Sequence, residues 1–316
     1  MKKQKTLSNW LQVQQPNMET FFCATETNAF FEKHLPANFC VINTIHIKIN
    51  QDHFEFYMCT NTKPIFLQAQ NVNCRKIELI KSLLQKAVRR QNVQVALSAA
   101  RDLYFIDPVQ LCRRLPIIIM EDTAVYDILP LTIWYSLIST HNPEYVNINA
   151  ILNIVRCITE SNKRTYLQQD NSLKPIHILK EGMNHQHKNL IISCVLRYSY
   201  GGMHGDMDMI LFLCEQLLND NVPIYSIEEN GSVNVNDIKS TMKTEWILDA
   251  IDFHCASQIF KQIANIKKIS YDDLKKLTWD NASSINKREK PHIENTEWTS
   301  IKGLVSYKQR LYLCSC

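Results

Sequence analysis

The one dense group of glycines in the chain encloses three side chains that could do chemistry. The segment 200–209 reads YGGMHGDMDM and holds three of the six glycines in the 316-residue sequence. His204, Asp206 and Asp208 are residue types that act as general acids and bases or ligate a metal, and glycine N–H groups can hold an anion. Helix capping explains the same residues, with a helix ending at Tyr200 and Asp206 capping the next one. His204, Asp206 and Asp208 are therefore candidate catalytic residues, and the alternative is that they only form the turn and the helix cap.

A second group of chemically capable residues is cationic. From Ile77 to Val88, apolar residues recur at helical spacing, which leaves basic side chains on the other faces of the predicted helix. A cationic helix face can neutralise phosphates, although many such faces are simply solvated. The residues predicted to contact phosphates are Lys81, Lys86, Arg89, Arg90 and Arg101.

This basic stretch also resembles a known family. Residues 75–122 are similar to the helical domain that follows the ATPase core in the replication-associated recombination protein A family, which includes Werner-helicase-interacting protein. The resemblance is carried by Leu79-Ile80, Ala99-Ala100-Arg101, Asp107-Pro108, Arg113-Arg114-Leu115 and Glu121-Asp122. It implies a helical module beside DNA-replication machinery and a possible homo-oligomer.

The rest of that family's pattern is missing from this sequence. No Gly-x-x-x-x-Gly-Lys-Ser/Thr motif occurs in it, so the ATPase activity is not carried over, and no cofactor is expected. The downstream sequence, including His204 and Trp279, does not follow the family either.

The charged residues at the end of the basic stretch have a structural interpretation. We expect Arg113, Arg114, Glu121 and Asp122 to lie on consecutive short helices around Pro116. Ion pairs among them would hold the turn, and they stabilise it more if they are half buried.

The first residues resemble a peptide that docks on sliding clamps of the PCNA type. That pattern is glutamine, two residues, an aliphatic residue, two residues and two aromatic residues. Gln4, Leu7 and Trp10 occupy its places, and Leu11 departs from the second aromatic. Such a peptide makes one helical turn that inserts its apolar side chains into a pocket. The alternative is that Trp10 and Leu11 pack on the protein's own core.

The elements that must position these residues are mainly helical. We predict a mainly α fold with a small β-rich N-terminal part (α+β) and a helical bundle-like core. The expected organisation is a flexible N-terminal tail (1–20), a β-rich segment (21–70), a helical domain (71–280), and a loop followed by C-terminal strand(s) (281–316). In the β-rich segment we expect a hairpin turning at Gln51-Asp52 and a third strand at 64–68. Helices are expected at 77–88, 93–104, from 107, and at 126–139, 147–160, 187–199, 207–218, 244–264 and 271–279.

The amino-acid composition indicates where in the cell the protein is located and which kinds of partner it could bind. A net charge of +4 permits contact with nucleic acid without requiring it. Eleven cysteines without a Cys-x-x-Cys pair predict free thiols in a reducing compartment, and no metal site. The apolar runs are too short to span a bilayer, so no membrane contact is expected. The predicted location is intracellular, at a nuclear or viral replication site.

Three functions remain open at the level of the sequence. The first is a non-enzymatic DNA replication or repair accessory protein that tethers to a sliding clamp and contacts DNA or a replication partner through the basic module. The second is a nucleic-acid-processing enzyme with its site at the glycine-rich turn, residues 200–209. The third is a structural or interaction protein of a large DNA virus or protist. High Asn, Ile and Lys usage suggests an AT-rich source genome.

Overall fold

The computed structural model describes residues 20–49, 52–67, 77–163, 175–182, 185–226, 232–240, 257–282 and 296–314. The chain divides into two compact units that do not follow the consecutive order predicted from the sequence. Unit 1 takes residues from 1–67, 112–150 and 162–228, and unit 2 takes residues from 68–111, 151–161 and 229–316. The fold is mainly α with a small N-terminal sheet, which confirms the predicted fold class.

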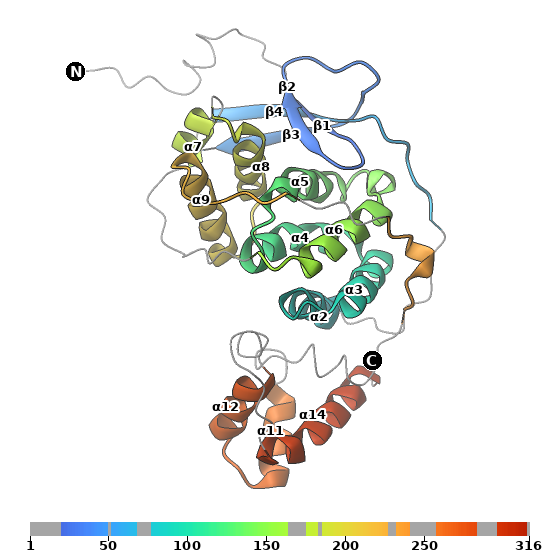
Figure 1. Cartoon of the computed structure of the whole chain (residues 1–316), viewed down its shortest axis with the longest axis vertical. Coiled ribbons are helices and arrows are strands. Elements are labelled where there is room, and N and C mark those ends of the chain that lie inside the picture. Colours follow the sequence, from blue (N-terminus) through green and yellow to red (C-terminus); the bar gives the residue numbers. More distant parts are fainter. Residues whose placement is uncertain are drawn as a thin grey trace, which may run out of the picture. The chain divides into compact units, whose positions relative to one another are not determined.

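The sheet of unit 1 has four strands in the order β2-β1-β4-β3 (Figure 1). They are β1 (Thr20–Ala24), β2 (Ala29–Glu32), β3 (Cys40–Ile49) and β4 (Asp52–Thr60). The hairpin between β3 and β4 is confirmed, with Ile49 opposite Asp52. The β1 strand inserts beside β4 in a parallel arrangement, with Cys23 opposite Cys59. The third strand expected at 64–68 is wrong for the residues described up to Leu67, where Ile65 N–H donates to the Glu144 carbonyl at 2.6 Å instead.

Helices of unit 1 support the sheet. They include α5 (Leu129–Ile138), α7 (Pro175–Gly182), α8 (Lys188–Ser199) and α9 (His204–Leu218), and α5 and α8 lie next to the strands in Figure 1. The fully buried Trp134 of α5 donates its indole N–H to the Phe22 carbonyl at 3.1 Å. This bond anchors the sheet to a helix, because the indole donor would otherwise be buried without a partner.

Unit 2 contains α2 (Ile77–Arg89), α3 (Val93–Ile106), α11 (Ser257–Lys267), α12 (Tyr271–Ala282) and α14 (Thr296–Cys314). The α2 and α3 helices are joined by a tight link in which Gln91 has φ +57° and Asn92 accepts a hydrogen bond from Val95 N–H at 3.2 Å. This side-chain cap fixes where α3 begins. The helices predicted at 77–88, 93–104 and 271–279 are confirmed within a few residues.

Two helices run from one unit into the other along the chain, α4 (Pro108–Asp122) and α6 (Ile148–Glu160). Asp107 caps α4 through Gln110 N–H at 3.1 Å, as the Asp-Pro pair predicted. The expectation of consecutive short helices around Pro116 is wrong, because α4 is one helix that continues through Pro116. Proline removes one donor from a helix but still allows its φ angle, so a well-packed helix can accommodate it.

The predicted C-terminal strand is also wrong, because residues 296–314 form α14. Trp298, Ile301 and Val305 are all buried, and their spacing of three and four residues is helical. The weak alternation of apolar and polar residues in this segment predicted a strand, but the helical spacing of its buried apolar residues favours a helix. Of the helix predicted at 244–264, residues 241–256 lie outside the described residues, and α11 covers the remainder and ends at Lys267.

Candidate functional site

The glycine turn between α8 and α9 brings the chain back on itself. Gly201 has φ +78°, and a Cβ placed on it would meet nothing within 4 Å. Glycine is therefore needed there for its backbone conformation and not for lack of space. The turn places His204 as the first residue of α9, so the helix begins three residues before the predicted start at Met207. Asp206 lies in the first turn of α9, which overturns its predicted role as the cap.

A buried arginine lies beneath this turn. Arg197, in the last turn of α8, is 3% exposed and donates from Nη1 to the Gly201 carbonyl at 2.7 Å. Its Nη2 lies 3.7 Å from the point that a Cβ on Gly202 would occupy. Among the described residues no carboxylate forms an ion pair with Arg197, and its Nε has no hydrogen-bond partner there. The guanidinium therefore carries a buried charge that is incompletely matched.

The electrostatic surroundings of Arg197 agree with this geometry. Burial lowers the pKa of Arg197 most, and the neighbouring Arg113 cation lowers it further, whereas Asp206 acts in the opposite direction. The guanidinium carbon of Arg113 lies 5.6 Å from the ring centroid of Tyr200, at the start of the glycine turn. Arg113 thus packs on an aromatic face. Arg197 and Arg113 both approach this turn, and the Asp206 carboxylate partly offsets the charge of Arg197.

A pocket of about 500 Å³ opens at the outer side of the turn. One predicted pair meets at it, because His204 Nδ1 lies 2.7 Å from Asp208 Oδ2. The His204 side chain is 93% exposed and that of Asp208 is 31% exposed. The pocket is lined by Lys48, Pro175, Tyr198, Ser199, Gly201, Gly202, His204, Met207 and Asp208. Asp206 is not among them, so the structure separates it from the other two catalytic candidates.

Lys48 is a charged pocket residue that the sequence did not predict. It lies near the end of β3, far from the glycine turn along the chain, and no local pattern links the two. The Ser199 hydroxyl also lines the pocket, but its hydrogen is donated to the Val195 carbonyl at 2.9 Å. The Lys48 ammonium is therefore a donor at the pocket, whereas Nε2 of a neutral His204 whose Nδ1–H is donated to Asp208 is an acceptor. Because Asp208 binds Nδ1, it orients the imidazole so that Nε2 can face a ligand.

Within the described part of the chain, no cluster of three His, Cys, Asp or Glu side chains could hold a metal ion. The cysteines described there are free thiols, and Cys23 and Cys59 are fully buried opposite one another in the sheet. A hydrogen bond from the Cys59 thiol lowers the pKa of Cys23 and raises that of Cys59.

The basic module, residues 75–122, has basic side chains that are more deeply buried than the sequence predicted. Lys86 is 3% exposed and donates to Ser82 Oγ at 2.6 Å. Arg101 is 6% exposed and pairs with Asp102, from Nη1 to Oδ1, at 2.9 Å. Buried, partnered cations cannot approach a phosphate backbone without unfolding their surroundings. The prediction that Lys86 and Arg101 contact DNA is therefore wrong.

The other three basic candidates remain at least partly accessible. Arg89 and Arg90 are of intermediate exposure. Lys81 lies 3.2 Å from Glu78 and equally close to the side-chain oxygen of Gln110. Any phosphate contact of the module is thus restricted to Lys81, Arg89 and Arg90.

The predicted ion pairs of α4 are found in part. Arg114 Nη2 lies 3.8 Å from Glu121 Oε2, with both side chains mostly buried, which confirms a pair across two turns of the helix. Arg113 turns instead to the Tyr200 ring. Asp122 is 2% exposed at the last residue of α4. The residues shared with the family resemblance therefore serve packing and pairing within this fold.

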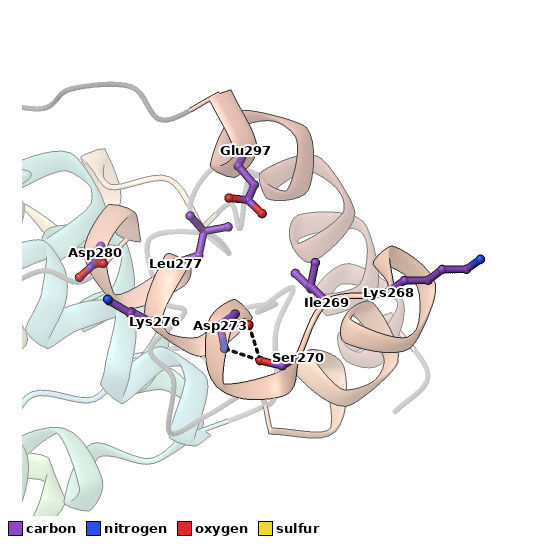
Figure 2. Close-up of a pocket in the computed structure, with 8 residues that line it drawn as sticks. All are labelled: Lys268, Ile269, Ser270, Asp273, Lys276, Leu277, Asp280 and Glu297. Carbon is purple, nitrogen blue, oxygen red and sulfur yellow. Dashed lines mark hydrogen bonds between the residues drawn. The ribbon is translucent and has the colours of Figure 1, made fainter.

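A second pocket, of about 490 Å³, lies in unit 2. Figure 2 shows carboxylates and lysines around it, from the start of α12 to the first turn of α14. Ser270 and Asp273 cap α12 there, with Ser270 Oγ 2.6 Å from Asp273 Oδ2 and Asp273 N–H donating to Ser270 Oγ at 3.0 Å. Capping explains these two polar groups. The lining residues are Lys268, Ile269, Ser270, Asp273, Lys276, Leu277, Asp280 and Glu297.

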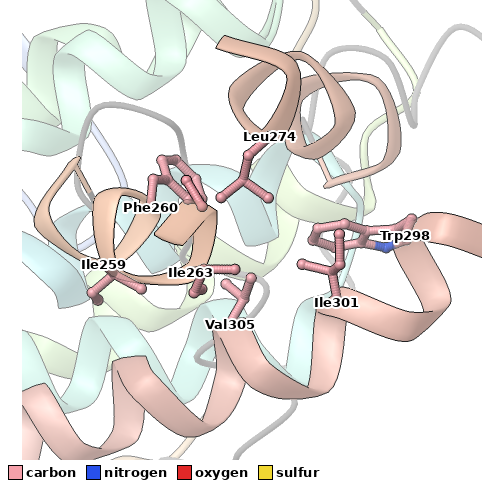
Figure 3. Packing of buried hydrophobic residues seen from close by; sticks show 8 residues of the cluster. Ile259, Phe260, Ile263, Leu274, Trp298, Ile301 and Val305 are labelled. Carbon is pink, nitrogen blue, oxygen red and sulfur yellow. The ribbon is translucent and has the colours of Figure 1, made fainter. Parts of the chain in front are cut away.

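The helices around this second pocket are held by an apolar cluster. Figure 3 shows Phe260 of α11, Leu274 of α12 and Ile301 of α14 facing one another. Phe260, Leu274 and Val305 are fully buried, so the cluster is well filled. Its role is packing, and the pocket beside it combines charges of both signs. The glycine-turn pocket is the better candidate site, because it brings the His204–Asp208 pair together with Lys48 from a distant strand.

Comparisons with protein-family models, with curated proteins and with solved structures found no match for this chain. None of the described helices is long and apolar enough to cross a membrane.

Proposed function

We propose that this chain is a non-enzymatic accessory protein of DNA replication or repair that docks on a sliding clamp. The observation that carries the proposal is the spacing of Gln4, Leu7, Trp10 and Leu11, which matches a clamp-docking peptide at all but its last position. These four residues lie outside the described residues. The first described element is β1, which begins at Thr20, so the motif precedes the sheet of unit 1.

Lysines beside the motif support docking on an acidic surface. Lys2 and Lys3 immediately precede Gln4, and opposite charge on a partner accelerates and orients association. The apolar Leu7 and Trp10 would supply the anchor, because a few buried apolar side chains dominate the affinity of short docked peptides.

Docking can be tested with the full chain and a purified sliding clamp. We expect binding of micromolar strength by calorimetry, and loss of that binding in the double variant Leu7→Ala and Trp10→Ala. Leu35→Ala is the matched control, because Leu35 is an exposed leucine of unit 1 (41% exposed) outside the motif. Absence of binding in the parent chain, or equal binding by the double variant, would remove the clamp from the proposal.

Contact with DNA or a replication partner is the second part of the proposal. Lys81, Arg89 and Arg90 are the basic side chains of the module that retain partial exposure. We expect DNA affinity that falls with salt and falls again in the double variant Arg89→Glu and Arg90→Glu. The same charge change at the exposed Lys33 and Lys63 is the control. Equal losses in both double variants would mean that net charge, and not this surface, causes the binding.

A nucleic-acid-processing enzyme is the second candidate function, favoured by the 2.7 Å contact between His204 Nδ1 and Asp208 Oδ2 at the pocket. An imidazole held by a carboxylate is suited to general acid–base catalysis. Incubation of the full chain with end-labelled single- and double-stranded oligonucleotides tests this candidate. Activity should be lost in His204→Ala and kept in His34→Ala, since His34 is exposed on the β2–β3 connection. Products that persist in His204→Ala would point to a contaminant or another site.

A further inference from the structure

One helix of unit 2, α11, has an exposed side that is polar and basic. Its sequence is SQIFKQIANIK, and none of its 11 residues is acidic. The other side of α11 is apolar, because Ile259, Phe260 and Ile263 pack in the cluster shared with α12 and α14 (Figure 3). The polar side takes no part in this packing.

The polar side chains of α11 form one continuous stripe. Their spacing of three and four residues places them on one face of the helix, opposite the apolar cluster. The four exposed members of this α11 stripe are Gln258, Lys261, Gln262 and Asn265. Ile266, which is 55% exposed, borders the stripe. At 1.5 Å per residue the stripe is about 10 Å long, so it is large enough to contact a partner.

The side chains of the α11 stripe are not used within the described part of the protein. No hydrogen bond or ion pair among the described residues engages any of the four. In α12, by contrast, Ser270 and Asp273 cap the helix, and the Asn281 amide donates to the Leu277 carbonyl at 2.8 Å. The amide groups of the α11 stripe can therefore donate to and accept from an external partner.

Two further lysines follow the α11 stripe, Lys267 and Lys268, and both are exposed. The helix dipole accounts for Lys267 in the last turn of α11, but not for Lys261 in the middle of the helix. Lys268 has φ +54°, a left-handed conformation that glycine normally takes just after a helix. A lysine is present there despite its conformational cost, and Figure 2 shows its side chain directed away from the nearby pocket. The surface is therefore basic along its whole length.

We propose that the α11 stripe binds in the major groove of duplex DNA. An α-helix fits this groove, where glutamine and asparagine amides form two hydrogen bonds with adenine. Lys261 and Lys268 can neutralise phosphates, and α11 has no carboxylate that the phosphates would repel. Ile266 offers an apolar contact for a thymine methyl group. Amides and lysines on one helix face thus match both the bases and the backbone of DNA.

This inference goes beyond the proposed function, because it assigns recognition of a DNA sequence to a surface other than α2. It would hold without clamp docking and without a phosphate contact through Arg89 and Arg90. Conversely, salt-dependent binding through α2 would not establish it, since phosphate contacts carry no sequence information.

The test begins with the full chain and a pool of DNA duplexes that have a randomised central segment. Selection of the bound duplexes, followed by sequencing, should yield a preferred site that contains A·T pairs. Fluorescence anisotropy should then show tighter binding to the selected duplex than to a scrambled one. Gln262→Ala should reduce that preference by about tenfold, the size expected for one lost pair of hydrogen bonds to a base. Gln94→Ala, at an exposed glutamine of α3, is the matched control and should leave the preference unchanged.

Charge variants separate this surface from α2. Lys261→Gln should weaken DNA binding and reduce its salt dependence by about one counterion, whereas Lys33→Gln, at an exposed lysine of unit 1, should not. The double variant Arg89→Glu and Arg90→Glu should lower the affinity for every duplex but keep the sequence preference. All these side chains are at least partly exposed, so the variants should fold, as circular dichroism would show.

Three results would overturn the proposal. The first is selection that yields no preferred sequence. The second is a preference that Gln262→Ala leaves unchanged. The third is equally tight binding of a duplex RNA of the selected sequence, because the deep, narrow major groove of RNA excludes a helix.

Discussion

The buried pair of Arg101 and Asp102 gives the sharpest test of how this fold uses its basic residues. The two side chains are 7% and 4% exposed, and 2.9 Å separates Arg101 Nη1 from Asp102 Oδ1. Arg101 Cζ also lies 5.1 Å from the ring centroid of Phe105. The variant Arg101→Met keeps an unbranched side chain of similar length over that ring, but leaves the Asp102 carboxylate buried without its guanidinium.

The expected loss of stability follows from the distance and the burial. Two unit charges 2.9 Å apart attract by about 6 kcal/mol at an effective dielectric constant of about 20. Desolvation of both groups offsets much of that attraction, so the pair as a whole contributes little. Removing one partner alone leaves a buried charge unmatched and costs about 3–5 kcal/mol. The free energy of unfolding of Arg101→Met should therefore fall by that amount.

Urea unfolding of the full chain, followed by circular dichroism, measures the change. Arg89→Met is the control, because Arg89 is only partly buried, and it should cost less than about 1 kcal/mol. The double variant Arg101→Met with Asp102→Asn should lose less stability than the sum of the two single variants, since neither charge is then left alone. A cost below about 1 kcal/mol for Arg101→Met, together with weaker DNA binding, would refute the reasoning and return Arg101 to the DNA-contacting residues.

Three further predictions concern single positions. Gly201→Ala should lower the free energy of unfolding by about 1–2 kcal/mol, because φ +78° strains any residue with a Cβ, and thermal melting would show it as a lower Tm. Trp134→Phe should cost about 1–3 kcal/mol in urea unfolding, because the buried Phe22 carbonyl loses the indole donor, and a cost near zero would mean that the carbonyl has another partner. Burial raises the pKa of Asp102, although hydrogen bonds from Ser240 and Arg101 oppose it, so only between its unfolded and native pKa values does the native state hold a proton that the unfolded state has lost. The contribution of Asp102 to stability should then fall as the pH rises from about 4 through its raised native pKa, and Asp102→Asn should abolish that slope in unfolding measured across pH.

The sequence by itself determined the local elements, because their signals act over a few residues. Alternation of apolar and polar residues predicted the β3–β4 hairpin, and the Asp107-Pro108 pair predicted the start of α4. The helical stripe from Ile77 to Val88 predicted α2. In each case the hydrogen bonds that form the element join residues that are close in sequence. A sequence pattern of the same length can therefore predict the element.

Only the tertiary structure decided which charged side chains are exposed and can reach a ligand. Lys86 and Arg101 read as exposed cations from the helix pattern, but packing buries both. Lys48 and His204 meet at one pocket although 155 residues separate their positions. Burial and convergence depend on contacts between segments far apart in sequence, and no local periodicity carries that information. The candidate site is therefore a product of the fold, whereas the clamp-like peptide at Gln4–Leu11 is a property of the sequence alone.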